Sequence, residues 1–419
     1  MGDRQLSVTV LTEYFAPEEA TTALLMTDLT TRLADRFDIS VITAHPNYHS
    51  DDRGTSVPRQ ETRDGVDVTR VRATRFDKDS LPLRVINWVT FTLLALVRLL
   101  RQSTDEDAVL TLSNPPILPF AAFVNKRLTG TPYCYLIHDM YPDMAVELGY
   151  LSSGSTVTRL WERAIRYVYR DADRIVVLGE SMRRRLEEKM ADDPEFDPEK
   201  IVVITNWEDE EFIEPVEKEE NEFAAEQDTV EKFTLLYSGN IGRFHDLETA
   251  IDAIERLEKR GRTDVQLVII GEGARKEPLR ERVDAQGIEN VRFLPFQPLE
   301  RLPETLTCGD ASLVGIKSGM VGMCVSSKLY SSLAAGMPVL AVVGEGDEVA
   351  RTVEACDCGE HVLPGDSERA ADILARWADN PDFADTLGEN ARACLEDRYT
   401  LDRAANEYAA VFEAMVGGQ

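Results

Sequence analysis

The chain of 419 residues is long enough for two or three domains, and its 43% of hydrophobic residues supplies more than one core. Its 75 acidic and 46 basic residues give a formal net charge of -29, which excludes broad nucleic-acid binding because phosphates would be repelled. Such an acidic excess is typical of proteins from salt-loving organisms, whose surface carboxylates keep them soluble. Any phosphate that the protein binds must therefore meet local basic residues.

Strands and helices alternate through the first half of the chain. Strands are predicted over residues 6–12, 37–43, 66–71, 108–112, 133–137, 175–178 and 201–204. Helical segments lie between most of them, and residues 22–36 carry leucines at the spacing of one helix face. Because strands that alternate with helices form parallel units, this half predicts a mostly parallel sheet covered on both faces.

The most apolar stretch of the chain is residues 85–100. It is shorter than the roughly 20 residues that a spanning helix needs, and Arg98 interrupts it. It is apolar on nearly every face, so it is either a buried helix or a helix that dips into a membrane surface. Arg84, Arg98 and Arg101 flank it and would suit anionic headgroups.

The second half repeats the pattern after an interruption. Residues 216–231 are acidic and lose the apolar period, which predicts a linker. Strands are predicted over residues 233–237, 265–270, 291–294, 311–316 and 338–343, with helices between them. Residues 401–415 predict a last helix that packs back on the first domain. The predicted fold class is α/β, with two doubly wound, Rossmann-like domains that face each other across a cleft.

Six cysteines are present, and their spacing gives little evidence of a role. Only Cys356 and Cys358 are close in sequence, and that spacing alone is a weak metal signal. We therefore expect free thiols, as in a reducing cytoplasm. The polar residues 1–5 predict no signal peptide.

The loop Ser238–Arg243 follows the first strand of the second domain and precedes a helix. Gly239 and Gly242 let backbone N–H groups approach phosphate oxygens, and a helix N-terminus favours an anion. Arg243 can bind a diphosphate through two N–H groups. We predict a phosphate site that also includes Asn240, and the alternative is an ordinary glycine turn with a surface arginine.

A second basic loop precedes a helix late in the second domain. Ser326 or Ser327 can cap that helix and offer donors to a phosphate, and Lys328 adds a positive charge. Lys317 lies upstream, at the start of a glycine-containing run. In so acidic a chain, two lysines around a glycine loop at a strand end predict phosphate contacts. The alternative is that the serines only cap the helix and the lysines are only solvated.

Polar residues also follow strands in the first domain. His138 and Asp139 follow the strand over 133–137, where a histidine beside a carboxylate can position and polarise hydroxyls, although such pairs are often structural. Glu18 and Thr21 follow the first strand and are predicted to face an acceptor. Their loop lacks glycine, which makes a dinucleotide fingerprint improbable.

Two further pairs need an interpretation. Gly271 and Glu272 follow a strand of the second domain, so they either contact the ligand or only form a turn. Asp171 and Asp173 have the spacing of a metal-binding pair, but they precede a strand, which is the wrong end for a site. We interpret them as part of a turn and expect no metal.

These motifs together resemble the glycosyltransferases of family 4, which have the GT-B fold of two Rossmann-like domains. Within that family the chain is similar to the branch that builds capsule, O-antigen and colanic-acid-type polysaccharides, with a haloarchaeal source expected. The resemblance rests on Tyr14–Glu18, Ser113–Pro116, His138–Asp143, Asn206–Trp207, Tyr237–Asp246, Ile270–Gly273 and Ser326–Val339. It covers nearly the whole chain.

The resemblance implies retaining transfer of a hexose from a nucleotide-diphospho-sugar, without a metal or other cofactor. It implies an acceptor-binding domain over 1–215, a nucleotide-sugar-binding domain over 216–398 and a terminal helix over 399–419. His138 and Asp139 would then be the catalytic residues, near the sugar and the acceptor. The leaving group is a nucleoside diphosphate, so groups that bind it stabilise charge that develops in the transition state.

The resemblance also assigns the diphosphate to Arg243 and Lys328, but the chain departs from the family at three positions. Met323 and Ser331 stand where the wider family has two glutamates, the second of which binds the donor ribose. Glu248 stands where the family often has a lysine, and Lys317 would have to substitute for that lysine. The ribose contacts must therefore come from elsewhere.

The expected function is transfer to a lipid-linked glycan acceptor, in cell-surface polysaccharide or glycoprotein glycan synthesis. We expect a cytoplasmic protein, peripheral at the inner face of the plasma membrane through residues 85–100. The alternatives are a nucleotide-sugar 2-epimerase of the same fold and an inactive nucleotide-sugar-binding relative, which the missing glutamates favour. The motifs do not encode the base, the sugar, the linkage or the oligomeric state.

Overall fold

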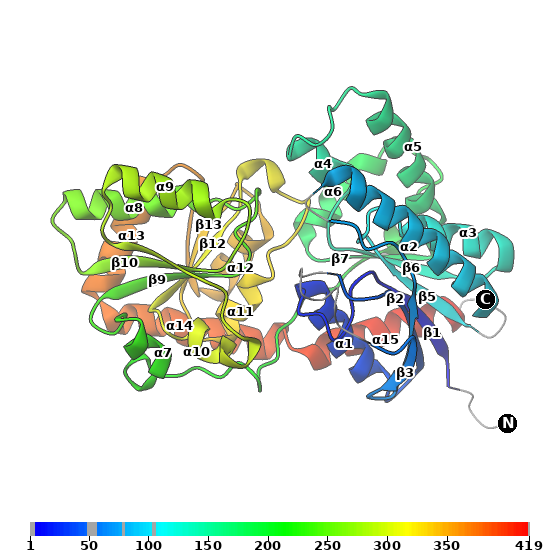
Figure 1. Ribbon diagram of the computed structural model, residues 1–419, viewed down its shortest axis with the longest axis horizontal. Coiled ribbons are helices and arrows are strands. Elements are labelled where there is room, and N and C mark those ends of the chain that lie inside the picture. The colour runs from blue at the N-terminus through cyan, green and yellow to red at the C-terminus, as the bar shows by residue number, and fades with distance from the viewer. Residues whose placement is uncertain (1–4, 48–56, 78–79, 103–105, 418–419) are drawn as a thin grey trace. The chain divides into compact units, whose positions relative to one another are not determined.

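The computed structural model describes residues 5–47, 57–77, 80–102 and 106–417 (Figure 1). The chain divides into two compact units. The first consists of residues 1–205 together with 401–419, and the second of residues 206–400. Each unit has its own parallel sheet with helices around it, as the alternating sequence pattern predicts.

An eight-stranded sheet of order β3-β4-β2-β1-β5-β6-β7-β8 forms the first unit. Its strands are β1 (Ser7–Leu11), β2 (Asp38–Ala44), β3 (Gln60–Arg63), β4 (Val66–Val71), β5 (Ala108–Leu112), β6 (Tyr133–Ile137), β7 (Arg174–Val177) and β8 (Ile201–Val203). Its helices are α1 (Thr21–Leu33), α2 (Leu81–Gln102), α3 (Pro119–Thr129), α4 (Asp143–Glu147), α5 (Thr156–Asp171), α6 (Glu180–Met190) and α15 (Leu401–Gly417). Only the edge pair β3–β4 is antiparallel among the described strands.

The switch point of this sheet lies between β1 and β5. Val8 of β1 is opposite Ile39 of β2 on one side and opposite Ala108 of β5 on the other. The chain therefore builds the sheet outward from β1 in both directions. In open parallel sheets, ligands bind outside the carboxyl ends of the strands at such a point.

The apolar helix α2 has one buried and one exposed face. It packs against β2, β4 and α3 through Asn87, Phe91, Ala95 and Leu99, which recur at helical spacing. Its opposite face exposes large apolar side chains, namely Leu81, Val85, Ile86, Val89, Leu93, Leu94 and Val97. The helix is therefore not wholly buried, which contradicts one of the two alternatives that the sequence left open.

The last helix, α15, belongs to the first unit. The ring of Phe412 packs edge-on against that of Phe37, with 5.8 Å between centroids, and Arg36 donates to the side chain of Asn406 at 3.0 Å. The predicted start at residue 399 is two positions early, because Tyr399 and Thr400 belong to the second unit.

The second unit has a six-stranded sheet of order β11-β10-β9-β12-β13-β14. Its strands are β9 (Phe233–Ser238), β10 (Val265–Ile270), β11 (Val291–Leu294), β12 (Ala311–Gly315), β13 (Val339–Val342) and β14 (Gly359–Val362). Its helices are α7 (Glu222–Glu226), α8 (Glu248–Lys259), α9 (Lys276–Gln286), α10 (Leu302–Leu306), α11 (Lys328–Ala334), α12 (Glu348–Cys356), α13 (Ser367–Asp379) and α14 (Pro381–Arg398).

The boundary after residue 215 is wrong, because residues 206–215 belong to the second unit. Arg392 of α14 donates to the carbonyl oxygens of Glu210 at 2.9 Å and Ile213 at 2.7 Å, which attaches this segment to the second unit. The linker predicted over 216–231 is wrong as well. It contains α7, whose Phe223 is 1% exposed in a small apolar cluster.

The expectation that all six cysteines are free thiols is also wrong. Cys356 at the end of α12 and Cys394 on α14 form a disulfide, with 5.9 Å between their Cα atoms. They are 38 residues apart in sequence, so only the packing of the two helices brings them together. The disulfide leaves four buried cysteines as thiols, namely Cys134, Cys308, Cys324 and Cys358.

Candidate functional site

The loops after β9 and β12 meet at the switch point of the second sheet. β9 is central, with β10 on one side and β12 on the other. The N–H of Asp246 donates to the carbonyl oxygen of Gly315 at 3.2 Å, and that of Lys317 to Phe244 at 2.9 Å. The predicted loop over 238–243 and the region of Lys317 therefore lie side by side, as the strand-end rule predicts.

Close backbone approach explains the glycines of this site. The N–H of Gly239 donates to the carbonyl oxygen of Ile270 at 2.9 Å. A Cβ atom at Gly271, whose φ is +149°, would lie 1.9 Å from the carbonyl oxygen of Gly239. A Cβ atom at Gly239 would lie 2.8 Å from Cε of Lys328. Only glycine at these positions allows the loops and the lysine to approach so closely.

Two lysine side chains from separate loops lie beside the glycine loop that carries Arg243. Nζ of Lys317 donates to the carbonyl oxygen of Arg243 at 2.8 Å, and the side chain of Arg243 is exposed. Nζ of Lys328 lies 3.4 Å from Nε2 of His245 and 5.2 Å from the ring centroid of Tyr237. The structure therefore places the charges of Lys317 and Lys328 beside the loop that carries Arg243, and the contact of all three residues with a phosphate stays a prediction.

His245 shows why the charge of Lys328 is poorly stabilised. Its Nδ1 accepts the N–H of Gly242 at 3.0 Å, so the proton of the neutral ring is on Nε2, which faces Lys328. Burial and the two nearby lysines lower the pKa of His245 well below its usual value. Burial lowers the pKa of Lys328 to about 8, and no ion pair of Lys328 occurs in the described part of the chain. An anion beside Lys328 would stabilise its charged form.

The serines before α11 do not cap it as predicted. Ser327 stands at the N-cap, but its backbone is helical (φ -63°, ψ -23°), and its hydroxyl makes no capping hydrogen bond. A side chain caps best from extended backbone, which explains the difference. Ser326 is buried, and its contact with a phosphate stays a prediction.

Other residues in and near these loops have partners within the protein. Glu272 pairs with Lys276 at 2.6 Å, and Glu248 forms an ion pair with Arg275. Glu248 therefore takes part in an internal ion pair, at the position where the family often has a phosphate-binding lysine. The carbonyl oxygen of Asn240 accepts the hydroxyl of Tyr237 at 2.6 Å, while the Asn240 side chain is exposed.

No sequence pattern points to Glu208, which lies beside α11. Its Oε2 accepts the hydroxyl of Ser331 at 2.5 Å, and Ser331 is on α11, one turn after Lys328. Ser331 occupies the position where the family resemblance expects a glutamate. The structure therefore places a carboxylate at this position from a segment that is distant in sequence.

In the first unit, His138 and Asp139 follow β6. Both of their backbone N–H groups donate to the hydroxyl of Ser113 at 3.0 Å. Burial lowers the pKa of His138 to about 4 and raises that of Asp139 to about 6. Nε2 of His138 is buried and has no hydrogen-bond partner among the described residues, so a neutral imidazole can bind a ligand hydroxyl there.

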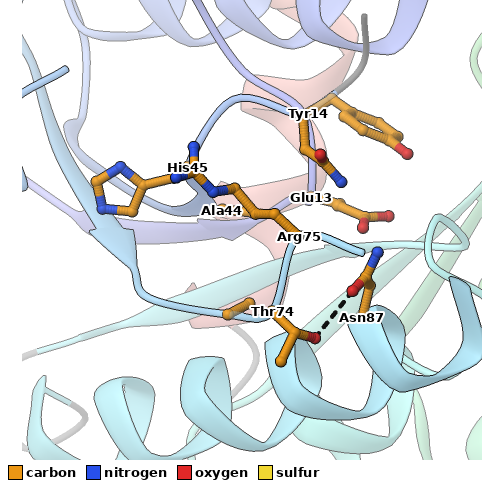
Figure 2. Close-up of a pocket in the computed structure, with 9 residues that line it drawn as sticks. Glu13, Tyr14, Ala44, His45, Thr74, Arg75 and Asn87 are labelled. Carbon is orange, nitrogen blue, oxygen red and sulfur yellow. Dashed lines mark hydrogen bonds between the residues drawn. The ribbon is translucent and has the colours of Figure 1, made fainter. Parts of the chain in front are cut away.

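A narrow pocket lies at the carboxyl ends of β1, β2 and β4 (Figure 2). Its lining includes Glu13, His45, Arg75 and Asn87. Glu18 is buried next to it, because its Oε1 accepts the N–H of the lining residue Asn47 at 2.8 Å. Thr21 is exposed at the start of α1 and does not line this pocket, nor do His138 and Asp139.

Asp171 and Asp173 have structural partners. The carboxylate of Asp173 accepts Nζ of Lys126 at 2.8 Å and the N–H of Tyr133 at 2.9 Å. Asp171 forms an ion pair with Arg127. Within the described residues, no group of three or more histidine, cysteine, aspartate or glutamate side chains could hold a metal ion.

Two family models match almost end to end along the chain. Residues 23–207 match the glycosyl transferase 4-like domain, and residues 218–393 match the glycosyl transferases group 1. The first match contains β2 to β8, and the second contains β9 to β14 with both predicted phosphate loops. The chain belongs to the family 4 glycosyltransferases and has the GT-B fold.

Similar proteins include WbjE of Pseudomonas aeruginosa, described as a probable glycosyltransferase, which is 28% identical over 82% of this chain and 84% of its own length. WcaI of Escherichia coli, described as a glycosyl transferase of colanic acid biosynthesis, is 28% identical over 50% of this chain and 51% of its own. Anabaena HepE, crystallised with UDP-glucose, superposes with a TM-score of 0.73 at 14% identity, covering 98% of this chain and 100% of HepE. That similarity shows the fold alone.

Proposed function

We propose that the protein is a retaining glycosyltransferase that moves a hexose from a nucleotide-diphospho-sugar to a lipid-linked glycan acceptor. The observation that carries this proposal is that Lys317 and Lys328 converge on the glycine loop that carries Arg243. The pathway is cell-surface polysaccharide or glycoprotein glycan synthesis. In support, WcaI is described by its part in colanic acid biosynthesis, and HepE binds UDP-glucose.

In this proposal the second unit holds the diphosphate of the donor. As the bond to the sugar breaks, negative charge develops on the departing nucleoside diphosphate, and the ammonium of Lys328 and the guanidinium of Arg243 stabilise it. Neutral His138 and the carboxylate of Asp139 bind hydroxyls of the sugar and the acceptor. The reaction needs no metal, because these cations supply the charge that a metal would otherwise provide.

Glu208 is the proposed ribose contact. A carboxylate can accept both hydroxyls of a ribose, and the resemblance places this role at the position of Ser331. Ser331 is too short to do so, but its hydroxyl binds the carboxylate of Glu208, which takes over the role of the missing glutamate.

A thermal-shift screen of nucleoside diphosphates and their sugars tests the donor site. At a ligand concentration of 100 times its dissociation constant, we expect about 2.7 kcal/mol of added stability for the nucleotide that matches the site. The screen is run in high salt because the acidic surface predicts a halophilic protein. If no nucleotide or nucleotide sugar stabilises the protein, the proposed donor site is wrong.

Proton NMR of the selected nucleotide sugar then separates the proposed transfer from the alternatives. Conversion of the nucleotide sugar by the protein alone would identify an epimerase. Binding without any turnover on lipid extracts would identify an inactive relative. A transferase releases the nucleoside diphosphate when a lipid-linked acceptor is added.

We also propose that α2 attaches the protein to the inner face of the plasma membrane. It is long and apolar enough to cross a membrane by length and composition, yet only 28% of its most apolar stretch is buried. Arg84, Arg98 and Arg101 are its only charged residues, so the helix is basic in a chain with a net charge of -29. A basic helix with an exposed apolar face is typical of helices that lie in a membrane surface.

Flotation with vesicles of anionic phospholipid tests this attachment. We expect the wild type to float and the double variant Val89→Asp, Leu93→Asp to lose at least tenfold in partitioning, because burying each aliphatic side chain contributes about 1.5–3 kcal/mol. Leu128→Asp is the matched control, since Leu128 is 67% exposed on α3, outside this face. A wild type that stays in the soluble fraction would contradict the proposal.

A further inference from the structure

The disulfide of the second unit joins two helices that border the proposed donor site. Cys356 is the last residue of α12, and Cys394 lies near the carboxyl end of α14. At the inner face of the plasma membrane, where the protein is proposed to act, thiols are kept reduced, and a disulfide there is usually transient, catalytic or redox-sensing. What reduction of this disulfide would change depends on what the two helices hold in place.

The helix α14 holds the helix that carries Lys328. Nη1 of Arg392 on α14 donates to the carbonyl oxygen of Ala334, the last residue of α11, at 2.8 Å. A Cβ atom at Gly388 of α14 would collide with the carbonyl oxygen of Gly336, so the backbones of α14 and of the turn after α11 are in direct contact. A shift of α14 therefore moves the short helix that presents Lys328 (Figure 1).

The segment that carries Glu208 depends on α14 as well. The guanidinium of Arg392 donates to the carbonyl oxygens of two residues in this segment, at 2.9 and 2.7 Å. The N–H of Glu208 donates to the carbonyl oxygen of Tyr399, directly after α14, at 3.1 Å. The proposed ribose contact is therefore positioned by the same helix as the proposed diphosphate contact of Lys328.

The other helix of the disulfide, α12, is connected to the loop of Lys317. The turn before α12 contains Gly344, where a Cβ atom would lie 2.6 Å from Cγ2 of Val321 and 3.1 Å from the carbonyl oxygen of Ser318. Ser318 directly follows Lys317 in the sequence. The disulfide therefore joins the helix next to the Lys317 loop to the helix that positions the two other contacts.

Reduction of the disulfide would not separate the two helices. Nδ2 of Asn390 on α14 donates to the carbonyl oxygen of Asp357, the residue after Cys356, at 2.9 Å. α14 also packs against α11 and α13. We therefore expect the reduced second unit to stay folded, with more freedom for α14 and for the groups that it positions.

We propose that Cys356 and Cys394 form a reversible thiol–disulfide switch that sets the affinity of the donor site. The inference rests on the proposed function, and it deepens it by naming how the donor site is regulated. In the disulfide form the groups that bind the donor are already ordered. The dithiol form must order them when the donor binds, at a cost in conformational entropy, so the oxidised protein binds the nucleotide more tightly.

Exchange with the disulfide of a small thiol balances the oxidation. Cys356 is half-buried and Cys394 is 6% exposed, so Cys356 is the sulfur that a small molecule reaches. Its thiolate attacks one sulfur of the small disulfide and releases one small thiol. The thiolate of Cys394 then attacks the Cys356 sulfur of this mixed disulfide and releases the second small thiol. The two protons and two electrons of the cysteine thiols thus pass to the small thiols, and reduction reverses both steps.

Calorimetry on the full-length protein tests the switch, with the nucleoside diphosphate that stabilises the oxidised wild type most. We expect dithiothreitol to weaken its binding about fivefold or more, and subsequent treatment with oxidised glutathione to restore it. Alkylation in denaturant, followed by mass spectrometry, verifies each state, because reduction exposes two additional thiols.

Two variants assign the effect to this pair of cysteines. The double variant Cys356→Ser, Cys394→Ser is expected to bind as weakly as the reduced wild type, with or without dithiothreitol. Cys358→Ala is the matched control, because Cys358 is a buried thiol two residues after Cys356 and outside the disulfide. We expect this variant to keep the full response to dithiothreitol.

The remaining outcomes separate the switch from the donor site. Equal affinity of the oxidised and reduced wild type would overturn the switch and leave the donor site in place. A response to dithiothreitol that persists in the double variant, or unfolding of the wild type on reduction, would also overturn it. If no nucleotide binds in either state, the donor site is wrong and the switch fails with it. The cycle of reduction and reoxidation decides the question even if the double variant does not fold.

Discussion

Replacing Lys328 with methionine is expected to weaken binding of the nucleoside diphosphate about 10- to 100-fold, because a hydrogen bond to a charged group contributes about 1.5–3 kcal/mol. Methionine keeps the length of the side chain that packs against Gly239 and removes only the charge. Calorimetry with the nucleotide that stabilises the wild type most would measure the change. Lys259→Met is the control, since Lys259 is 68% exposed on α8 of the same unit.

The pH dependence makes this prediction specific to Lys328. Its pKa of about 8 means that the free protein loses the ammonium charge as the pH rises through that value. The phosphates are fully ionised well below it, since their last ionisation lies near pH 6. Wild-type affinity should therefore fall between pH 7 and pH 9 while that of the methionine variant stays flat. Equal pH profiles would show that Lys328 does not bind the phosphate.

Replacing Gly271 with alanine is expected to disrupt the donor site more than any change of charge. The new Cβ atom would lie 1.9 Å from the carbonyl oxygen of Gly239, and no side-chain rotation can relieve a clash with backbone. Either the loop after β9 moves and nucleotide binding is lost, or the second unit loses more than about 3 kcal/mol of stability. Chemical denaturation and nucleotide calorimetry would measure the two effects.

Gly346→Ala separates this crowding from backbone strain. Gly346 has a φ of +77° in the same unit, but a Cβ atom there would meet nothing within 4 Å. Its replacement costs only the strain of a left-handed residue, about 1–2 kcal/mol. If both alanine variants behaved alike, the close contact between Gly271 and Gly239 would have no functional importance.

The order of strands and helices was predictable because buried parallel strands leave long apolar runs in the sequence. The predicted bounds of 265–270 and 133–137 agree with β10 and β6. Two edge strands were missed for the same reason. All four residues of β3 (Gln60–Arg63) are polar. β14 begins at Gly359 and continues with Glu360 and His361, so neither strand shows an apolar pattern.

The boundary and the linker depended on contacts that composition does not reveal. A run of acidic residues predicts a solvated segment, but one buried Phe223 and the capping side chain of Asn221 are enough to order it. The attachment of residues 206–215 depends on Arg392, which is far away in sequence. The disulfide between Cys356 and Cys394 likewise depends on a contact between residues that are distant in sequence.

The meeting of the loops after β9 and β12 was predictable because the strand-end rule and the glycines indicate the same place, and their binding of a phosphate stays a prediction. The pocket lined by Glu13 and Arg75 and the position of Glu208 were not predictable, since each depends on side chains brought together by folding. The retaining mechanism, the absence of a metal requirement and the halophilic character stay predictions. So do the roles of Glu18, Thr21, His138 and Asp139.

The position of α15 has a consequence for synthesis on the ribosome. Tyr408 and Phe412 complete the core of the first unit, yet they are translated only after the whole of the second unit. At about 5–20 residues per second, translation of residues 206–400 takes roughly 10–40 s, during which the first sheet lacks a helix. The second unit can finish folding before the first, so the order of completion is the reverse of the order of synthesis.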